Sequence, residues 1–363
     1  MYILAIVVVS FTLLQFIVAA FNLAFKPDLG KYELHDDPLI SVLIPARNEE
    51  NNIGVILKDL IRQSYSNIEI IVFDDQSTDQ TPLIVEQIGE SDPRIRLISS
   101  DKLPEGWLGK NFGCHSLSHQ AKGDYLLFLD ADVRIGNDII QLAAAYSQKF
   151  NIGLLSIFPD QLMITRGEKM TVPIMNYILL SLLPLPLVLG SGFPSLTAAN
   201  GQFMLFNNQV YKKIYPHEFA RANKVEDITI AHYFKQKGIP VACLTGNKSI
   251  QCRMYRGFDE AVNGFAKNIT AFFGNSFLLA TFFWLITTFG FIPVFIAFPL
   301  NISGAYLVIF LVTRIFVSIA SNQNIATNML YLIPQQLTMA LFIYKAFTNK
   351  FFYQYQWKGR DIS

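Results

Sequence analysis

Acidic side chains follow three short apolar runs in the first half of the chain. Such runs are typical of buried strands, and the carboxyl ends of parallel strands meet at one edge of a sheet. Carboxylates gathered there repel one another unless a cation neutralises them, so the pattern predicts a site for Mg²⁺ or Mn²⁺ and a phosphorylated ligand. The side chains are Glu49 after 40–45, Asp74 and Asp75 after 68–73, and Asp130 and Asp132 after 125–129.

An α/β domain is needed to hold these carboxylates together. Apolar residues recur at helical spacing between the strand-like runs, and this alternation predicts a mostly parallel sheet with helices on both faces. Ligands of such sheets bind at the carboxyl ends of the strands. The expected strands are 40–45, 68–73, 95–99 and 125–129, and the expected helices are 51–63, 81–88, 111–120 and 138–150.

The composition excludes several classes of function. The chain has 29 Lys and Arg against 28 Asp and Glu, a formal net charge of +1, so it lacks the basic excess of a nucleic-acid-binding protein. Charged residues make up 16% and hydrophobic residues 52%, which excludes intrinsic disorder and indicates a membrane protein. A P-loop kinase is not favoured either, because the sequence has no Gly-x-x-x-x-Gly-Lys-Ser/Thr motif.

Two regions are apolar enough to lie in a membrane. Residues 1–25 carry no charge and exceed the ~20 residues that span a bilayer, so we expect a retained N-terminal transmembrane anchor rather than a cleaved signal peptide. Between 268 and 344 only Arg314 is charged. About three C-terminal transmembrane helices are expected there, within 276–298, 302–320 and 328–347.

Basic residues next to the spans set the expected orientation. Lys26 and Lys31 follow the first span, which places the middle of the chain in the cytoplasm by the positive-inside rule. Three further full spans would leave the basic tail 348–363 on the opposite side. Either one C-terminal segment is re-entrant or interfacial, with the segment that contains Pro334 the first suspect, or the tail departs from the rule.

A further apolar stretch, 170–211, lies inside the otherwise water-soluble region 39–267. It has no charged residue and includes four prolines, which argue against a straight membrane-spanning helix. Two interpretations remain open. The stretch is either a face that meets the bilayer or a buried insert of an enlarged core.

Three sequence segments carry a resemblance to a known family. They are SVLIPARNEE at 41–50, VFDDQSTD at 72–79 and GDYLLFLDAD at 123–132. In this order they resemble the membrane-bound family 2 glycosyltransferases of GT-A fold, over 39–267. These enzymes transfer a sugar from a nucleotide-sugar donor with inversion at the anomeric carbon. The resemblance implies a GT-A nucleotide-diphospho-sugar transferase domain, cytoplasmic in an integral protein of a bacterial-type cell membrane.

The same resemblance implies roles for the residues at the strand ends. The nucleoside pocket would be lined by Pro45, Glu49 and Asp75. Asp74 would support that pocket or cap the following turn. Mg²⁺ or Mn²⁺ and the donor diphosphate would be bound by Asp130 and Asp132.

A later acidic pair, Glu226-Asp227, precedes the helical run 228–237. By resemblance, Asp227 is the general base that takes the proton from the acceptor hydroxyl. A carboxylate near an acidic site has a raised pKa, which suits a base. The alternative is a helix N-terminus, where acidic residues are favourable without any catalytic role.

Arg253 and Arg256 match the two arginines of a Gln/Arg-x-x-Arg-Trp motif found in the branch with lipid or polysaccharide acceptors. Their role by resemblance is to bind the donor diphosphate, which the rigid fork of a guanidinium suits. Gly257 stands where that motif has Trp, which weakens any assignment to polysaccharide elongation. The alternative is a pair of arginines at the membrane surface.

A narrower resemblance comes from PEGWLGKNFGC at 104–114 and WKGR at 357–360. Both look like the subgroup that glycosylates carotenoids, together with hopanoid-associated and ceramide-type relatives. Lys110 then reaches a donor phosphate, or it is a solvated residue before a helix.

The expected function is an inverting hexosyltransferase that moves a hexose from a nucleotide sugar, with UDP-hexose favoured, to the hydroxyl of a lipophilic membrane acceptor such as a carotenoid or another isoprenoid alcohol. Three alternatives remain. A polyprenyl-phosphate glycosyltransferase would need no general base, a polysaccharide synthase would need more spans, and a non-enzymatic membrane binding module would not need all the acidic motifs.

Overall fold

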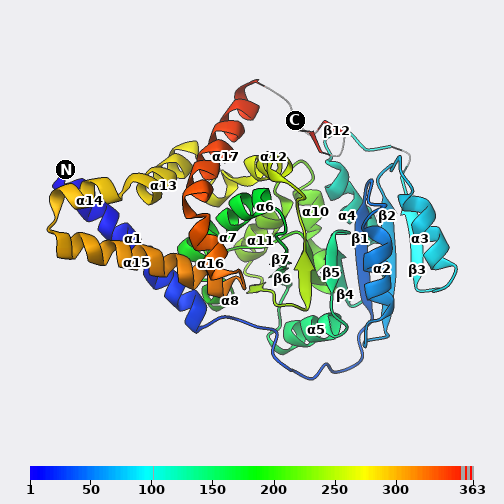
Figure 1. The fold of residues 1–363 in the computed structure, drawn as a ribbon. Coiled ribbons are helices and arrows are strands. Elements are labelled where there is room, and N and C mark those ends of the chain that lie inside the picture. Colours follow the sequence, from blue (N-terminus) through cyan, green and yellow to red (C-terminus); the bar gives the residue numbers. More distant parts are fainter. Residues whose placement is uncertain (101, 353–355, 358–359, 362–363) are drawn as a thin grey trace.

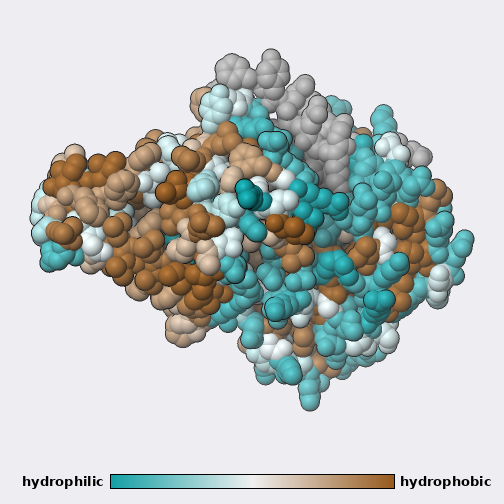
Figure 2. Space-filling view, in the orientation of Figure 1, coloured by the Kyte–Doolittle hydropathy of each residue, from teal (hydrophilic) through white to brown (hydrophobic). Residues whose placement is uncertain are grey.

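The computed structural model describes residues 1–361 apart from 101, 353–355 and 358–359, with backbone alone for 351–352, 356–357 and 360–361. An α/β domain forms one end of the molecule, and a bundle of apolar helices projects from its side (Figure 1). In the view of Figure 2, hydrophobic residues gather on the projecting helices and hydrophilic ones over the α/β domain.

A seven-stranded sheet forms the centre of the α/β domain, in the order β3-β2-β1-β4-β8-β6-β9. Every neighbouring pair is parallel except β4–β8 and β6–β8. Four expected strands are confirmed, and three more complete the sheet. The strands are β1 Ile40–Ala46, β2 Ile68–Asp74, β3 Ile95–Ser99, β4 Tyr125–Leu129, β6 Leu154–Phe158, β8 Phe203–Asn207 and β9 Val241–Thr245.

Both faces of the sheet are buried, as its continuous apolar strands predict. Val42 packs into a core with the buried faces of α2 and α5, whereas its neighbour Leu43 points to the opposite core, with α4 and α11. Successive side chains of a strand alternate between faces, so each core takes every second residue. The helices are α2 Ile53–Ile61, α3 Thr81–Gly89, α4 Gly109–Gln120, α5 Ile139–Lys149 and α11 Glu226–Gln236.

Short elements extend the domain beside the main sheet. A second sheet has the order β5-β10-β7, with β5 Val133–Ile135, β7 Asp160–Gln161 and β10 Ile250–Cys252. Two further short strands pair near the C-terminal end, β11 Gln356–Trp357 and β12 Arg360–Asp361. The remaining short helices are α6 Arg166–Thr171, α8 Pro186–Gly190, α9 Asn208–Ile214 and α10 Pro216–Phe219.

Among the described residues, two helices are long and apolar enough to cross a membrane, α1 Tyr2–Ala24 and α15 Leu300–Ala320. A third span arises if α12 and the short 3-10 helix η1 count with α13, although the chain bends by 98° between them. The expected span 276–298 is two shorter helices that meet at Gly290. The bounds are α12 Phe258–Asn268, η1 Ala271–Phe273, α13 Phe277–Phe289 and α14 Phe291–Ala297.

The last expected span forms α16 Ile325–Leu330 and α17 Leu332–Phe352. Gln335 and Gln336 of α17 are buried, and Gln335 donates a 3.1 Å hydrogen bond to the carbonyl of Lys169 in the α/β domain. In Figure 1, α17 runs across the direction of α15 where the bundle joins the domain. Helix α17 is therefore attached through Gln335 to α6 of the α/β domain.

The apolar stretch 170–211 is buried in α7 Pro173–Leu182 and in β8, and contact with a bilayer stays a prediction. Its first part, α7, binds the membrane helix α1. Gln15 of α1 donates to Tyr177 Oη at 3.2 Å and to Ser181 Oγ at 3.0 Å, and Asn22 donates to the carbonyl of Leu180 at 2.9 Å. Its last part is β8, a buried strand of the main sheet. The stretch thus serves as core and as the docking face for α1.

Candidate active site

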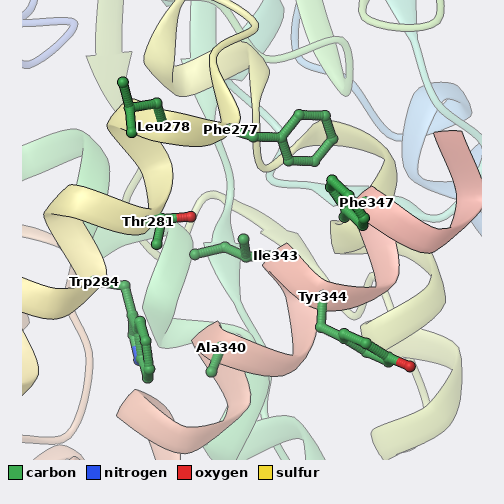
Figure 3. Close-up of a pocket in the computed structure, with 8 residues that line it drawn as sticks. All are labelled: Phe277, Leu278, Thr281, Trp284, Ala340, Ile343, Tyr344 and Phe347. Atoms are coloured by element: carbon green, nitrogen blue, oxygen red, sulfur yellow. The ribbon is translucent and has the colours of Figure 1, made fainter. Parts of the chain in front are cut away.

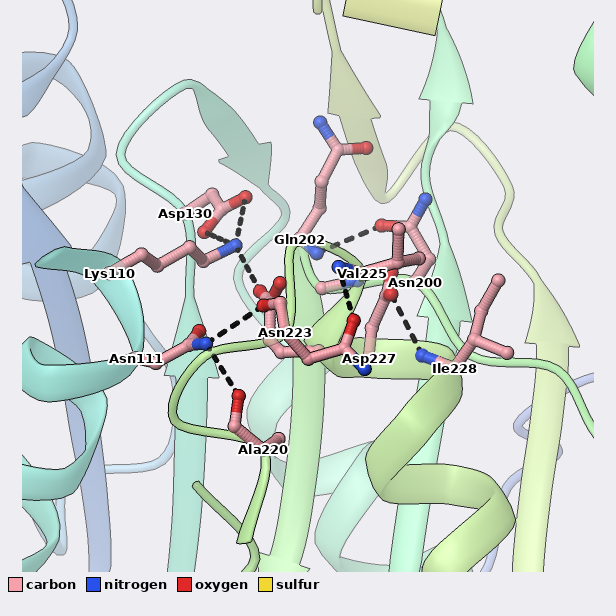
Figure 4. A network of polar contacts seen from close by, with 12 residues as sticks. Lys110, Asn111, Asp130, Asn200, Gln202, Ala220, Asn223, Val225, Asp227 and Ile228 are labelled. Atoms are coloured by element: carbon pink, nitrogen blue, oxygen red, sulfur yellow. Dashed lines mark hydrogen bonds and ion pairs between the residues drawn. The ribbon is translucent and has the colours of Figure 1, made fainter. Parts of the chain in front are cut away.

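Lys110 lies at the centre of the candidate site, between two carboxylates (Figure 4). Its Nζ atom is 2.9 Å from Asp130 Oδ1 and 3.1 Å from Glu226 Oε1. Burial alone would lower the pKa of this ammonium, but the charges of Asp130 and Glu226 raise it well above its usual value. The lysine is therefore a fixed positive charge at the carboxyl end of the central strands.

Three elements position the triad formed by Lys110, Asp130 and Glu226. Asp130 follows the end of β4, Lys110 is in the first turn of α4, and Glu226 begins α11. Asn111 joins two of these elements, because its Nδ2 atom donates to the carbonyls of Ala220, Arg221 and Asn223 at 2.8, 3.2 and 2.9 Å. The loop that leads into α11 is thus fixed to the start of α4.

Asp227 lies one residue beyond the triad and is held by backbone donors. The N–H of Gly201 donates to Asp227 Oδ2 at 2.9 Å, and the N–H of Ile228 donates to Oδ1 at 2.8 Å. Burial and then the charge of Glu226 raise the pKa of Asp227 to about 7. A carboxylate with this pKa can accept a proton near neutral pH, as a general base must.

Asp132 is the second strand-end carboxylate of β4. Burial, followed by the charges of Asp130 and Glu49, raises its pKa to about 7, and burial likewise raises the pKa of Asp130. The Oδ1 atom of Asp132 is buried without a hydrogen-bond partner among the described residues. A buried carboxylate oxygen without a hydrogen-bond donor is suited to bind a cation.

Asp130 and Asp132 fit a divalent cation in the chemistry of their oxygen donors, which Mg²⁺ and Mn²⁺ prefer. The described part of the chain has no group of three or more His, Cys, Asp or Glu side chains placed to hold a metal ion. The protein would therefore supply two carboxylates at most, with the other positions left to substrate phosphate and water, as is usual for Mg²⁺.

The ends of β1 and β2, where we predict the nucleoside pocket, lie side by side. Pro45 pairs with Phe73 in the parallel register, and the Asp75 N–H donates to the Ala46 carbonyl at 2.8 Å. Asp74 accepts hydrogen bonds from the Ser77 N–H at 3.2 and 3.3 Å, so it caps the turn. This is one of the two roles expected for Asp74.

Glu49 connects the β1 end to the central carboxylates. Its charge raises the pKa of both Asp130 and Asp132, and its Oε2 atom accepts a 2.8 Å hydrogen bond from Asn52. Asn52 in turn accepts from Arg256 Nη2 at 3.5 Å. The structure therefore brings Arg256, which is exposed, to the edge of the candidate site beside Glu49.

Arg253 lies in a different environment from Arg256. Its Nη2 atom is 2.8 Å from Glu168 Oε1, a carboxylate with no exposed surface. Glu168 also forms a capping box with Thr165 at the start of α6. In this structure the guanidinium of Arg253 is bound to a structural carboxylate, although its Nε atom is buried without a partner among the described residues.

Two features of the site were not predicted. Glu226 was expected only as the neighbour of Asp227, yet it binds Lys110, and Gly201 leaves little room for a side chain. A Cβ atom there would be 3.1 Å from Lys110 Nζ and 3.3 Å from Glu226 Oε1. The acidic pair 226–227 could have indicated the first. The segment 199–202 also matches the carotenoid-type subgroup in sequence, but the contacts of Gly201 follow only from the fold.

Known proteins resemble this chain in sequence. The family model described as glycosyl transferase family 2 matches residues 41–214. The 4,4'-diaponeurosporenoate glycosyltransferase of Staphylococcus haemolyticus is 28% identical over 240 residues, or 63% of this chain and 60% of that protein. A protein of the same name from Staphylococcus aureus is 26% identical over 252 residues, or 68% and 65%. The matches thus span less than two thirds of these relatives.

A solved structure shares the fold. A mannosyltransferase from Pyrobaculum calidifontis, in complex with GDP-Man and Mn²⁺, superposes with a TM-score of 0.58 at 16% identity, over 96% of this chain and 99% of the other. At this identity the similarity concerns the fold alone. The part of the chain that holds the strand-end carboxylates therefore resembles glycosyl transferase family 2 in sequence over residues 41–214, and the chain has a GT-A type of fold.

Proposed function

We propose that this protein is an inverting hexosyltransferase that moves a hexose from a nucleotide sugar to a carotenoid-type lipid in the membrane. The observation that carries the proposal is the juxtaposition of Asp227, whose pKa is about 7, with the cluster formed by Lys110, Asp130 and Glu226. A base beside a site for a diphosphate is what single displacement at a sugar carbon requires.

Each group has a proposed role. The nucleoside lies at the ends of β1 and β2, near Pro45, Glu49 and Asp75, and the diphosphate lies against Lys110. Asp130 and Asp132 would hold Mg²⁺ or Mn²⁺, which when bound would neutralise charge on the diphosphate. Asp227 takes the acceptor proton.

The two arginines are assigned separately. We place Arg256 at the rim, where it can contact the donor diphosphate, since its side chain is exposed beside Asn52. For Arg253 to contact the donor, it would have to leave Glu168. Arg256 is therefore the better supported of the two expected diphosphate ligands.

The acceptor class rests on the membrane helices and on the relatives. The relatives are named for 4,4'-diaponeurosporenoate, a carotenoid carboxylate. A carboxylate acceptor is already deprotonated at neutral pH, whereas a hydroxyl needs a base. The placement of Asp227 beside the site, with a pKa of about 7, favours a hydroxyl acceptor in this protein, and a carboxylate is the second candidate.

We also propose the domain organisation expected from the sequence. Residues 1–25 anchor the chain, 39–267 form the catalytic domain on the cytoplasmic side, and 276–347 lie in or on the membrane. The buried Gln335 and Gln336 on α17 support an interfacial last segment, which removes the conflict with the positive-inside rule. The tail 348–363 lies largely outside the described residues.

A transfer assay tests the proposal. Membranes containing the protein receive labelled UDP-glucose, UDP-galactose or GDP-mannose, Mg²⁺ or Mn²⁺, and a lipid extract rich in carotenoid alcohols and acids. We expect label in the organic phase that requires the divalent cation. Label that also requires Asp227, tested with Asp227→Asn, indicates a hydroxyl acceptor. Label that survives this change indicates a carboxylate or a polyprenyl phosphate, which acid lability separates. No label with any donor contradicts the proposal.

A further inference from the structure

An apolar cavity of about 450 Å³ lies between α13 and α17, outside the α/β domain. In Figure 3 the two helices run side by side, and Thr281 and Ile343 point into the space between them. On α17 the lining side chains are spaced by three or four residues, so they form one stripe. The lining residues are Phe277, Leu278, Thr281, Trp284, Ala340, Ile343, Tyr344 and Phe347.

The walls of this cavity are fixed by hydrogen bonds between the two helices. Trp284 Nε1 donates to the Gln336 carbonyl at 2.9 Å, and Thr288 Oγ1 donates to Gln336 Oε1 at 3.0 Å. At the other end, the rings of Phe277 and Phe347 meet edge to face with centroids 5.7 Å apart. The cavity is thus formed before any ligand binds, which is typical of small-molecule sites.

Helix α17 also packs on α12. Phe342, next in sequence to the lining residue Ile343, is fully buried, and its ring is tilted against that of Phe265 with centroids 5.4 Å apart. Phe265 meets Tyr255 edge to face at 4.9 Å, and Tyr255 lies between Arg253 and Arg256 in the segment before α12. Helix α17 therefore contributes both to the cavity and to the packing of α12.

The chemistry of the lining selects a class of ligand. Four of the eight lining side chains are aromatic, and flat rings pack well against a flat conjugated chain. Lys350, one turn beyond Phe347, places its Nζ atom 5.4 Å from the centre of the Phe277 ring. This charge lies at the end of the cavity nearest the bend before α13, and it complements an acidic group on a ligand.

We propose that the cavity between α13 and α17 binds the conjugated hydrocarbon chain of an acidic polyene lipid, with Lys350 near its carboxylate. This inference rests on the proposed function, since the lipid would be the carboxylate acceptor that stands there as the second candidate. An ordinary acyl chain of the bilayer is the competing occupant. It would gain little from aromatic walls and would show no dependence on Lys350.

Binding of parinaric acid, a conjugated tetraene fatty acid, tests the proposal in purified full-length protein. Energy transfer from tryptophan reports the bound probe, and substitution of Trp107 and Trp357 by Phe leaves Trp284, which lines the cavity, as the only donor. Ala340→Phe fills the cavity, and Val308→Phe is the matched control, because Val308 is 59% exposed on α15 and lies outside the lining. Lys350→Gln is compared with the wild type using the acid and its methyl ester.

We expect saturable binding that Ala340→Phe weakens at least tenfold and Val308→Phe leaves unchanged. Lys350→Gln should weaken the acid but not the ester. Equal binding to Ala340→Phe and wild type, or equal loss in Val308→Phe, would overturn the proposal. Hydrolysis of UDP-hexose without acceptor is measured in parallel. Retained hydrolysis in Ala340→Phe shows that the α/β domain is intact. If wild type hydrolysed none of the donors, that would count against the proposed function, whereas binding of parinaric acid would still test whether the cavity takes a polyene.

Discussion

The backbone N–H of Gly201 donates a 2.9 Å hydrogen bond to Oδ2 of Asp227. This bond joins the segment before β8 to the first turn of α11, and it orients the carboxylate that we propose as general base. Because a Cβ at Gly201 would lie 3.1 Å from Lys110 Nζ, the residue sets both the direction of Asp227 and the space for Lys110.

Gly201→Ala should therefore reduce kcat at least tenfold while the protein stays folded. The added methyl group would push the end of Lys110 or Glu226 aside by a few tenths of an ångström, and a small misplacement of reacting groups has a large effect on rate. Gly192→Ala is the control, since a Cβ there has no atom within 4 Å. Equal rates for the two variants would argue against a crowded centre.

The pH dependence of transfer to a hydroxyl acceptor should follow Asp227. Burial and the charge of Glu226 raise the pKa of this carboxyl to about 7, and a base works only when deprotonated. We expect kcat/KM to fall about tenfold per pH unit below pH 7 and Asp227→Asn to lower it roughly 10²–10⁴-fold. A flat profile between pH 5 and 8 would instead fit an acceptor that is already anionic.

Lys110→Met should abolish sugar transfer, and it should make the melting temperature depend more strongly on divalent cations. Without the ammonium, the carboxylates of Asp130 and Glu226 face each other, which is unfavourable. Added Mn²⁺ should then raise the melting temperature of the variant more than that of wild type. Lys102→Met, at an exposed position, should behave as wild type in both measurements.

Arg253 and Arg256 should respond differently to substitution by alanine. Arg253→Ala leaves Glu168 buried and unpaired, which should cost roughly 3 kcal/mol or more of stability. The pKa of Glu168 is lowered by the hydrogen bond from Arg253 against the effect of burial. The stability from this pair is therefore present at neutral pH and lost as the pH falls through that lowered pKa.

Arg256→Ala should leave the melting temperature nearly unchanged, because the side chain is exposed, and should raise KM for the donor. Thermal unfolding in detergent and donor titrations separate the two variants. If Arg253→Ala changed only KM, the pair with Glu168 would not be structural.

Sequence periodicity predicted the first four strands and their helices, because buried parallel strands and amphipathic helices leave strong local patterns. It could not predict that β8 joins the sheet in the antiparallel direction, since β8 lies inside an apolar stretch that also contains α7. Nor could periodicity predict that Arg253 and Arg256 have different surroundings. Both fit one motif, and only the fold brings Glu168, 85 residues away in the chain, to one of them.

The membrane spans were predicted by hydropathy where the whole helix is apolar, as in α1 and α15. Hydropathy was less informative for 276–298, where the helix is interrupted at Gly290, and for α17, where buried Gln335 contacts the α/β domain and buried Gln336 contacts α13. Average apolarity does not reveal which side of a helix packs on protein and which side meets lipid.

The hydrogen bonds from Gln15 and Asn22 to α7 limit how the apolar helix α1 can move relative to the α/β domain. Both side chains are buried, so separating the two elements would leave polar groups without partners, which costs free energy. We therefore expect α1 and the domain that holds the candidate site to move as one unit. With α1 in a membrane, as we propose, the site carboxylates would stay at a fixed distance from it.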